Sequence, residues 1–446
     1  MRARFGTDGI RGVANTELTP ELLLALGRAC ARALGPGSVL VGRDTRRSGP
    51  LLQAALSAGL AAEGTDVCDL GVLPTPGIAF AAASRSVPAF VVSASHNPYR
   101  DNGVKVFDAT GRKIPRKTEA VIEEALDAVL GTDEADLGDP TVGALTTYAG
   151  AHDDYVDHLC ASVEGGSLDG LTVVVDAANG AATEVAPLVF ARLGARVQTI
   201  GATPNGENIN DGCGSTHPEA LIASVRDSGA DLGLALDGDA DRLVACDADG
   251  NLVDGDVLLA LFAADLQAQG RLEGKTIVAT VLSNLGLTRA MDAIGVTVVS
   301  CPVGDRNVLQ AMDAGGFVLG GEQSGHIVFR DQATTGDGIL TAVMLCDLVC
   351  RAKQPLADLA AGAMTRLPQV SATVTVADVA RLDDAMPLWA EVAVVEAELA
   401  DRGRVVVRAS GTEAAVRVMV EAPTDEEARA AAARLSAAVA HALGSS

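Results

Sequence analysis

Aromatic residues are scarce in this chain. Phe, Tyr and Trp together make up 3% of its 446 residues. Hydrophobic residues still reach 48%, so we expect Ala, Val and Leu to fill ample cores. A chain of this length is too long for a single core, and we therefore expect several domains.

Basic residues are also few, with 34 Lys and Arg against 58 Asp and Glu and a net charge of -24. This balance repels phosphate-rich partners at long range, which argues against nucleic acid and anionic membrane surfaces. Residues 1–6 contain no apolar signal segment, and no apolar run approaches the length that spans a bilayer. We therefore expect no membrane partner, while an anionic small molecule stays possible where basic residues converge.

The eight cysteines are scattered and include no C-x-x-C pair. Cys346 and Cys350 share a helix face, but buried small hydrophobes are a more ordinary interpretation than a metal pair. We expect a reduced, cytoplasmic protein.

Strand and helix signals alternate along most of the chain. A strand is predicted at 38–44, and the stretches 171–180 and 275–284 begin two further units, each an apolar strand followed by a polar loop and then a helix. After residue 355 the pattern changes to alternating strands and an Ala-rich helix at 425–443. We therefore predict three related mixed-sheet α/β domains plus a small C-terminal α+β domain around a central cleft. The predicted boundaries are 1–153, 154–255, 256–367 and 368–446.

The segment 89–107 is the candidate for phosphoryl chemistry. Residues 90–92 predict a short buried strand, and open α/β sheets place their chemistry in the loop that follows a strand. That loop contains Ser95 and His96, and Lys105 returns on the next extended segment. A hydroxyl in this setting could carry or receive a phosphoryl group. For this segment alone, a polar turn without chemistry is an equal alternative.

Turn-forming residues occur on both sides of Tyr99. Asn97 and Pro98 precede it, and the run Asp-Asn-Gly follows at 101–103. We therefore expect a turn on each side.

Three carboxylates follow the apolar run 232–236, at Asp237, Asp239 and Asp241. In an extended or looping backbone this spacing points them to one side, where a hard divalent cation would remove their mutual repulsion. An EF-hand loop beginning at Asp237 is excluded, because its sixth position would be Arg242 instead of Gly and its twelfth would be Ala248 instead of Glu. Mg²⁺ shared with a phosphate fits three carboxylates better. The alternative is a solvated acidic turn.

Two further glycine-containing loops follow strands. Residues 320–326 contain Glu322 and Ser324, which suit sugar hydroxyls or an amine, and His326, which could be a general acid/base or simply structural. Residues 408–413 with Arg417 resemble an anion site, in which hydroxyls, backbone N–H groups and guanidinium groups grip a phosphate.

A third glycine-containing stretch, 270–276, superficially suggests a nucleotide P-loop. It has three residues between its glycines where that loop needs four, and its Lys-Thr pair begins a strand. We reject a P-loop on both grounds.

Together these motifs resemble the α-D-phosphohexomutase family over nearly the whole chain. In order, the family's phosphoserine, metal, sugar and phosphate loops are similar to residues 93–98, 237–242, 321–326 and 408–412. Residues 6–12 and 321–326 are most similar to the branch that acts on glucosamine phosphates.

The resemblance implies roles for individual residues. Ser95 would carry the phosphoryl group, and one phosphoserine oxygen would join Asp237, Asp239 and Asp241 around one Mg²⁺ per active site, with Arg242 neutralising charge. Proton transfer would fall to Lys105, His326 or Arg11. Substrate would be bound by Glu322, Ser324, Arg408, Ser410, Gly411, Thr412 and Arg417.

The implied activity is an intramolecular phosphotransfer between glucosamine 6-phosphate and glucosamine 1-phosphate, on the route to UDP-N-acetylglucosamine. Glucosamine 1,6-bisphosphate would be the intermediate and activator, the partner a small sugar phosphate, and the protein a monomer or homodimer. The alternatives are a phosphomannomutase/phosphoglucomutase, a Mg²⁺-dependent sugar phosphatase, or a non-catalytic sugar-phosphate sensor.

Overall fold

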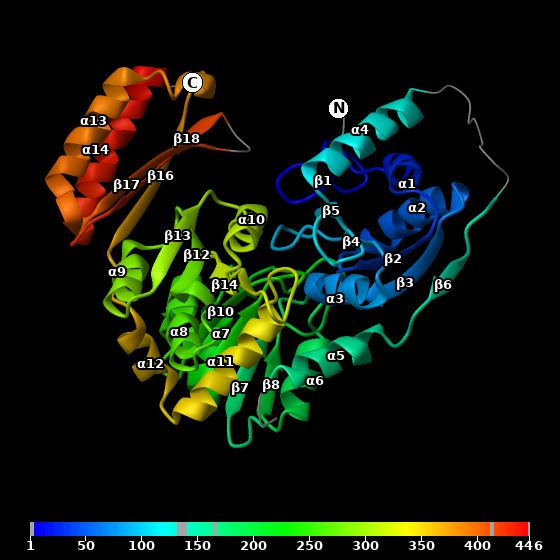
Figure 1. The fold of residues 1–446 in the computed structure, drawn as a ribbon, viewed down its shortest axis with the longest axis horizontal. Helices are drawn as coiled ribbons and strands as arrows, with labels where there is room; N and C mark the ends of the chain where they lie inside the picture. The colour runs from blue at the N-terminus through cyan, green and yellow to red at the C-terminus, as the bar shows by residue number, and fades with distance from the viewer. Residues whose placement is uncertain (1–3, 132–140, 164–166, 411–413, 445–446) are drawn as a thin grey trace.

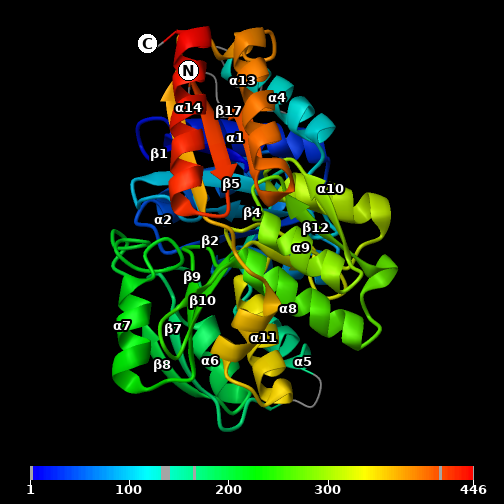
Figure 2. The same cartoon turned by 90° about the vertical axis from the view of Figure 1, so that its left-hand side faces the viewer.

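Four β-sheets, each with its own helices, succeed one another along the chain in the computed structural model (Figure 1). The structure describes residues 4–131, 141–163, 167–410 and 414–444. The first and fourth sheets lie at the two ends of an arc, and the second and third lie between them (Figure 1). In the view turned by 90°, the fourth sheet and its helices lie in front of the first (Figure 2).

The first sheet has six strands in the order β1-β5-β4-β2-β3-β6. Strands β2, β3, β4 and β6 are parallel, and β5 and β1 add an antiparallel edge. Its strands are β1 (Ile10–Val13), β2 (Ser38–Arg43), β3 (Asp66–Val72), β4 (Ala89–Val92), β5 (Asp101–Phe107) and β6 (Leu145–Thr147). Its helices are α1 (Pro20–Leu34), α2 (Gly49–Ala62), α3 (Thr75–Arg85) and α4 (Arg116–Leu130).

The second sheet has the order β11-β10-β9-β7-β8, with β7, β8 and β9 parallel and β10 and β11 antiparallel. Its strands are β7 (Thr172–Asp176), β8 (Arg196–Ile200), β9 (Leu232–Leu236), β10 (Leu243–Asp247) and β11 (Leu252–Val253). The helices of this part are α5 (Ala151–Ala161), α6 (Val185–Arg192) and α7 (Glu219–Ser228).

The third sheet repeats the pattern in the order β13-β12-β14-β15, with only β15 antiparallel. Its strands are β12 (Thr276–Thr280), β13 (Thr297–Cys301), β14 (Leu319–Gly321) and β15 (Ile327–Phe329). Its helices are α8 (Gly255–Ala268), α9 (Leu285–Ala293), α10 (Asp305–Gly315), α11 (Gly338–Ala352) and α12 (Leu356–Ala363).

The fourth sheet is fully antiparallel, in the order β16-β18-β17. It is formed by β16 (Gln369–Thr375), β17 (Arg404–Ala409) and β18 (Ala415–Glu421), and it is covered by α13 (Met386–Leu399) and α14 (Asp425–Leu443) (Figure 1). The predicted fold class, three mixed α/β sheets and a small C-terminal α+β part, is therefore confirmed.

Each sheet places a candidate site loop at the same kind of connection. Residues 93–100 join β4 to β5, residues 237–242 join β9 to β10, and residues 322–326 join β14 to β15. Each of these turns leads from the last strand of the parallel set into the antiparallel strand that lies next to it in the sheet. The fourth loop joins the antiparallel pair β17 and β18. The sequence predicted a loop after each strand but not this shared hairpin position.

The first three sheets share a hydrophobic core, and the fourth has its own. One continuous cluster of buried side chains runs from α3 on the first sheet through the second and third sheets to α12. A second cluster fills the other face of the first sheet beneath α1, α2 and α4. The fourth sheet packs on α13 and α14 through a separate cluster. Polar contacts join it to the third part, because Arg404 Nη2 donates to Ser283 O at 2.6 Å and Glu421 Oε2 accepts the Leu285 N–H at 3.0 Å.

The turn predicted at 101–103 is wrong, because these residues begin strand β5. Asp101 pairs with Val13 of β1, and the buried Asn102 side chain donates to Ser48 Oγ at 2.9 Å. Gly103 is needed because β5 passes close to the backbone of Ser93, and not because of a turn: a Cβ there would lie 2.8 Å from Ser93 O. Tertiary pairing has overridden local turn propensity.

Among the described residues, no helix combines the length and apolar content needed to span a bilayer.

Candidate active site

The Ser95 hydroxyl is buried where the first and second sheets meet. Ser95 is 1% exposed and adopts a left-handed φ of 53°. Its Oγ donates a hydrogen bond to Asp237 Oδ2 at 2.6 Å, across 142 residues of sequence. The structure thus brings the expected phosphoryl carrier directly against the expected metal loop.

His96 Nδ1 lies 3.3 Å from Ser95 Oγ. Burial, with the nearby charges of Arg242 and Arg11, lowers the pKa of His96 to about 4. The imidazole is therefore neutral at pH 7 and adds no charge beside the serine.

Asp237, Asp239 and Asp241 form a buried cluster in which one oxygen of each lies within 4.8 Å of the others. Burial, and the charges of the other two carboxylates, raise the pKa of Asp237 well above its ordinary value. Asp239 Oδ1 and Asp241 Oδ1 are buried without a hydrogen-bond partner among the described residues. Unpartnered buried carboxylate oxygens are costly, and a small divalent cation with oxygen ligands removes that cost. The cluster therefore fits Mg²⁺.

Neighbouring side chains orient Asp239 within this cluster. Thr75 Oγ1 donates to Asp239 Oδ2 at 2.6 Å, and Lys105 Nζ donates to the same oxygen at 2.9 Å. Both contacts occupy Oδ2 and leave Oδ1 free for a cation, which is how outer-shell groups set the direction of metal ligands.

Arg242 closes the metal loop. Its backbone N–H donates to Asp237 Oδ1 at 3.2 Å, and its Nε lies 3.8 Å from Asp241 Oδ1. The guanidinium therefore stands beside the carboxylates whose charge it was predicted to neutralise.

Lys105 is 1% exposed and surrounded by carboxylates. Its Nζ lies 2.9 Å from Asp239, 3.2 Å from Asp8 and 3.4 Å from Asp241. Burial alone would raise the pKa of Asp8, but the charges of Lys105 and other nearby cations hold it well below its usual range. Arg11 pairs with Asp8 and lies beside the serine loop, so Arg11 and Lys105, both predicted site residues, meet at Asp8.

His326 is buried and faces the metal loop. Its Nδ1 lies 3.8 Å from Asp241 Oδ1, and its Nε2 accepts the Gly336 N–H at 3.1 Å. Burial works against protonation, yet the nearby carboxylate of Asp241 raises the pKa of His326 overall. A ring protonated on both nitrogens would lose the Gly336 contact, so the Nδ1–H form fits both partners.

The two sugar-binding candidates differ in exposure. Glu322 is half-buried, and its Oε1 accepts the Gly304 N–H at 3.0 Å. Ser324 is exposed. Glu322 therefore ties the sugar loop to the turn before α10, while the Ser324 hydroxyl faces solvent.

Arg408 and Arg417 lie opposite each other on β17 and β18. Burial and the charge of Arg417 lower the pKa of Arg408. Ser410 is buried, and its Oγ has no hydrogen-bond partner within the described part of the chain. Two cations and an unpartnered hydroxyl suit an anion. Gly411 and Thr412 lie outside the described residues.

Sequence reasoning missed four residues that shape the site. Asp8 and Thr75 contact Lys105 and Asp239, while Arg46 and Asn210 contact the backbone of the serine loop. Arg46 follows strand β2 in the same way that the recognised motifs follow theirs, so its position was the available signal. Asn210 offered none, because it lies in a long polar loop.

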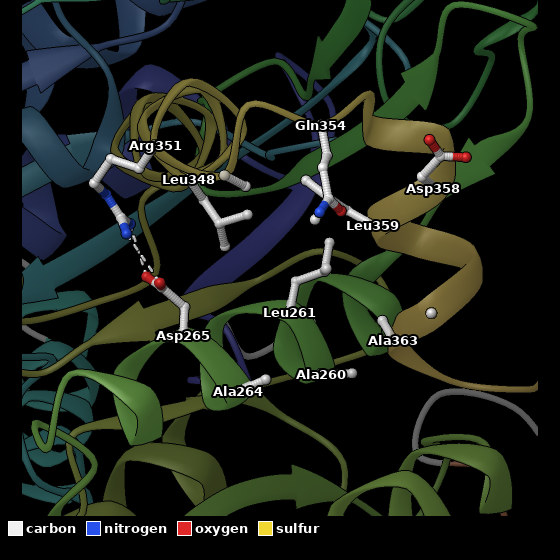
Figure 3. Close-up of a pocket in the computed structure, with 12 residues that line it drawn as sticks. Ala260, Leu261, Ala264, Asp265, Leu348, Arg351, Gln354, Asp358, Leu359 and Ala363 are labelled. Atoms are coloured by element: carbon white, nitrogen blue, oxygen red, sulfur yellow. Dashed lines mark hydrogen bonds and ion pairs between the residues drawn. The ribbon is translucent and has the colours of Figure 1, made fainter.

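A separate groove lies between α8, α11 and α12 (Figure 3). Its floor is largely apolar, with Leu261 and Leu348 among its side chains, and the Arg351–Asp265 ion pair spans one side at 2.7 Å. None of the predicted site residues lines it.

Comparison with known proteins matches four family models in chain order. They are the phosphoglucomutase/phosphomannomutase α/β/α domains I (residues 2–130), II (153–250) and III (254–367) and the C-terminal domain (366–438). The chain is 51% identical over 456 residues to a phosphoglucosamine mutase of Frankia alni, covering 99% of each chain. It is 49% identical to a phosphoglucosamine mutase of Streptomyces griseus, covering 100% of each.

Solved structures agree on the fold. A phosphoglucomutase/phosphomannomutase family protein from Burkholderia thailandensis aligns with a TM-score of 0.83 and 27% identity, covering 99% of this chain and 98% of that one. The Aspergillus fumigatus N-acetylphosphoglucosamine mutase, solved in complex with GlcNAc-6P and magnesium, aligns with a TM-score of 0.72 at 19% identity, covering 98% and 96%. With four domain models spanning almost its entire length, the chain belongs to the phosphoglucomutase/phosphomannomutase family, the α-D-phosphohexomutases.

Proposed function

We propose that this protein is a phosphoglucosamine mutase that interconverts glucosamine 6-phosphate and glucosamine 1-phosphate. The observation that carries the proposal is the Ser95 Oγ to Asp237 Oδ2 contact of 2.6 Å, beside two carboxylate oxygens with no partner among the described residues. Relatives about half identical in sequence and bearing that name support the choice of sugar.

In the first step, the 6-phosphate is held by Arg408, Ser410 and Arg417, and Glu322 and Ser324 hold the sugar. The phosphoryl group moves from phosphorylated Ser95 to O1, so the P–Oγ bond breaks and a P–O1 bond forms. O1 loses its proton and Oγ gains one, and in the second step Oγ gives up its proton as O6 gains one. The product is glucosamine 1,6-bisphosphate with an unphosphorylated Ser95.

The bisphosphate then turns over, which brings its 1-phosphate to the arginine pair and its 6-phosphate to Ser95. The P–O6 bond breaks, a P–Oγ bond forms and O6 gains a proton. Because the sugar presents a phosphate at either end, one distal anion site serves both steps.

Asp237, Asp239 and Asp241 would hold Mg²⁺, which would supply positive charge to stabilise the transferring phosphoryl oxygens. Lys105 and His326 are our candidates for moving the sugar proton. Lys105 Nζ lies 2.9 Å from Asp239 and His326 Nδ1 lies 3.8 Å from Asp241, so each candidate stands beside the metal loop. Arg11, paired with Asp8, supports the charge balance around Lys105.

Replacing the phosphoryl carrier tests the proposal. Ser95→Ala should abolish interconversion while leaving the thermal unfolding temperature within a few degrees of wild type. Ser84→Ala, which changes another serine of the first part of the chain, should keep full activity. Turnover by Ser95→Ala at the wild-type rate would reject the mechanism.

Wild-type product analysis separates the alternatives. Release of inorganic phosphate faster than formation of the 1-phosphate would indicate a phosphatase. A higher kcat/KM for glucose or mannose 6-phosphate than for glucosamine 6-phosphate would change the sugar but keep the mutase.

We also propose that the four parts of the chain divide at residues 153, 255 and 367, that the 1,6-bisphosphate activates the enzyme, and that it works in the cytoplasm. The shared core of the first three parts and the separate core of the fourth support the last division. Eight free cysteines support a reducing compartment.

A further inference from the structure

The backbone of Ser95 is held in a conformation that a serine does not adopt freely. Its φ of 53° lies in the left-handed region, which is strained for a residue other than glycine. Such a conformation persists only where surrounding contacts determine it. The Ser95 carbonyl accepts two hydrogen bonds, from Arg46 Nη2 at 2.8 Å and from Asn210 Nδ2 at 2.9 Å.

Arg46 is a buried guanidinium, 1% exposed, whose hydrogen bonds reach along the serine loop. Besides Ser95 it donates to the carbonyl of Asn97 at 2.8 Å, to that of Asp101 at 3.0 Å and to that of Pro98. One planar guanidinium therefore holds four backbone carbonyls in the segment from Ser95 to the first residue of β5.

Asp44 completes the support on the N–H side of Ser95. Its Oδ2 accepts Arg46 Nε at 2.9 Å and Ser93 Oγ at 2.7 Å. The same Ser93 Oγ accepts the Ser95 N–H at 3.0 Å. The carbonyl and the N–H of Ser95 are thus tied to one buried ion pair.

Asn210 reaches the loop from the second part of the chain, between β8 and α7. Its own N–H donates to Ala178 O at 2.9 Å, which anchors it beside β7. Its Nδ2 donates to Ser95 O at 2.9 Å and to Asn97 O at 3.2 Å. A Cβ at Gly238 would lie 2.7 Å from Ser95 O and 2.8 Å from Asn210 Nδ2, so the two loops are packed without spare room.

We propose that Arg46 and Asn210 are positioning residues that hold Ser95 in its left-handed conformation and so aim its Oγ at the metal loop. Neither touches the proposed substrate groups. Phosphorylation and dephosphorylation change the charge on Oγ during each cycle, and a loop held by fewer bonds would move in response. A displacement of about 1 Å at a reacting atom can cost roughly a hundredfold in rate. The inference rests on the proposed phosphoryl transfer.

Asn210→Asp is the sharpest test, because it keeps the size of the side chain but replaces the two N–H donors with an oxygen facing two carbonyls. We expect kcat to fall about a hundredfold, with KM for the sugar phosphate within about twofold of wild type. Asn208→Asp is the matched control. It lies in the same loop and also loses a donor to a carbonyl, that of Thr203, but it does not contact Ser95.

Phosphoryl uptake gives a second readout that does not depend on sugar turnover. Dephosphorylated enzyme is mixed with glucose 1,6-bisphosphate, and the gain of one phosphoryl group is followed by intact mass. Asn210→Asp should take up the group much more slowly than wild type and Asn208→Asp. Arg46→Lys keeps the charge but lacks the planar guanidinium that reaches several carbonyls. If a thermal unfolding measurement shows that this variant is folded, it should also take up the phosphoryl group slowly.

Failure of the inference and failure of the proposed function give different results. Wild-type kcat and uptake in Asn210→Asp would overturn the inference, and so would a loss that appears equally in KM or accompanies a collapse in unfolding temperature. A wild-type enzyme that takes up the phosphoryl group but does not interconvert glucosamine phosphates would reject the proposed function and leave the uptake comparison valid.

Discussion

Ser95 Oγ and Asp237 Oδ2 lie 2.6 Å apart although they belong to hairpin loops of two different sheets. Both loops leave the last strand of a parallel set and return along the antiparallel strand next to it. Repeating this unit places chemically active turns at equivalent positions, and packing the sheets together brings the turns face to face. The site is thus a consequence of how the repeats dock.

Removing one carboxylate from the aspartate cluster should weaken cation binding. Asp239→Asn keeps the shape but loses the charge of a group whose Oδ1 is buried without a partner among the described residues. We expect at least about a tenfold to hundredfold loss in Mg²⁺ affinity, measured by calorimetry on dephosphorylated enzyme. Asp249→Asn, an exposed carboxylate close in sequence, should bind as wild type. Equal affinities in both variants would contradict the assigned metal site.

Thr75 should act on the metal through Asp239. Thr75→Val keeps the branched shape but removes the hydroxyl that donates to Asp239 Oδ2 at 2.6 Å. Asp239 Oδ2 then keeps only the contact with Lys105 Nζ, so the carboxylate is oriented less firmly and we expect Mg²⁺ affinity to fall about tenfold. Thr75→Ser retains the donor and is the control, so calorimetry on the pair isolates the hydroxyl. A loss shared equally by Thr75→Ser would instead indicate a packing effect.

Sequence reasoning found the parts of the site that are local. Ser95 and the three aspartates each stand directly after a short apolar run, and strand ends are readable from one sequence. The strands near 172 and 276 were predicted for the same reason and lie at Thr172–Asp176 and Thr276–Thr280.

What could not be predicted depends on contacts between distant segments. Asn210 meets Ser95 across 115 residues, and Thr75 meets Asp239 across 164. No local pattern marks either residue, since a threonine at a helix start and an asparagine in a polar loop are ordinary. The wrong turn at 101–103 has the same origin, because pairing with β1 decided its conformation.

The arginine pair of the fourth sheet should set affinity for the sugar phosphate. Arg408→Gln removes one of two cations that face each other across strands β17 and β18. Burial and the charge of Arg417 lower the pKa of Arg408, and a bound anion would offset that repulsion. We expect KM to rise about tenfold or more with a smaller change in kcat, and the ratio of the variant's KM to that of wild type to shrink as added salt screens the arginine–phosphate attraction. Arg429→Gln, an exposed arginine on α14, is the matched control. An unchanged KM in Arg408→Gln would remove this hairpin from the substrate site.

Titration of Asp337 should make the protein less stable as pH rises, the opposite of the usual effect of an aspartate. Asp337 caps α11 by accepting the Leu340 N–H at 2.9 Å, accepts the Tyr155 hydroxyl at 2.8 Å, and is 2% exposed. Burial raises its pKa from 3.8 to about 6. The folded state therefore binds the proton more tightly than the unfolded state, so this group's contribution is full below pH 4 and is lost as pH rises through 6.

Asp337→Asn should remove that dependence, because the amide stays neutral and can still cap the helix. Relative to wild type, the variant should gain roughly 2 kcal/mol of unfolding free energy between pH 4.5 and pH 7.5, seen as a rising difference in thermal unfolding temperature. Asp358→Asn, an exposed carboxylate on α12, should follow wild type across the range. If the difference between Asp337→Asn and wild type stays constant with pH, the buried carboxyl is already ionised throughout, and its two hydrogen bonds offset the cost of burial.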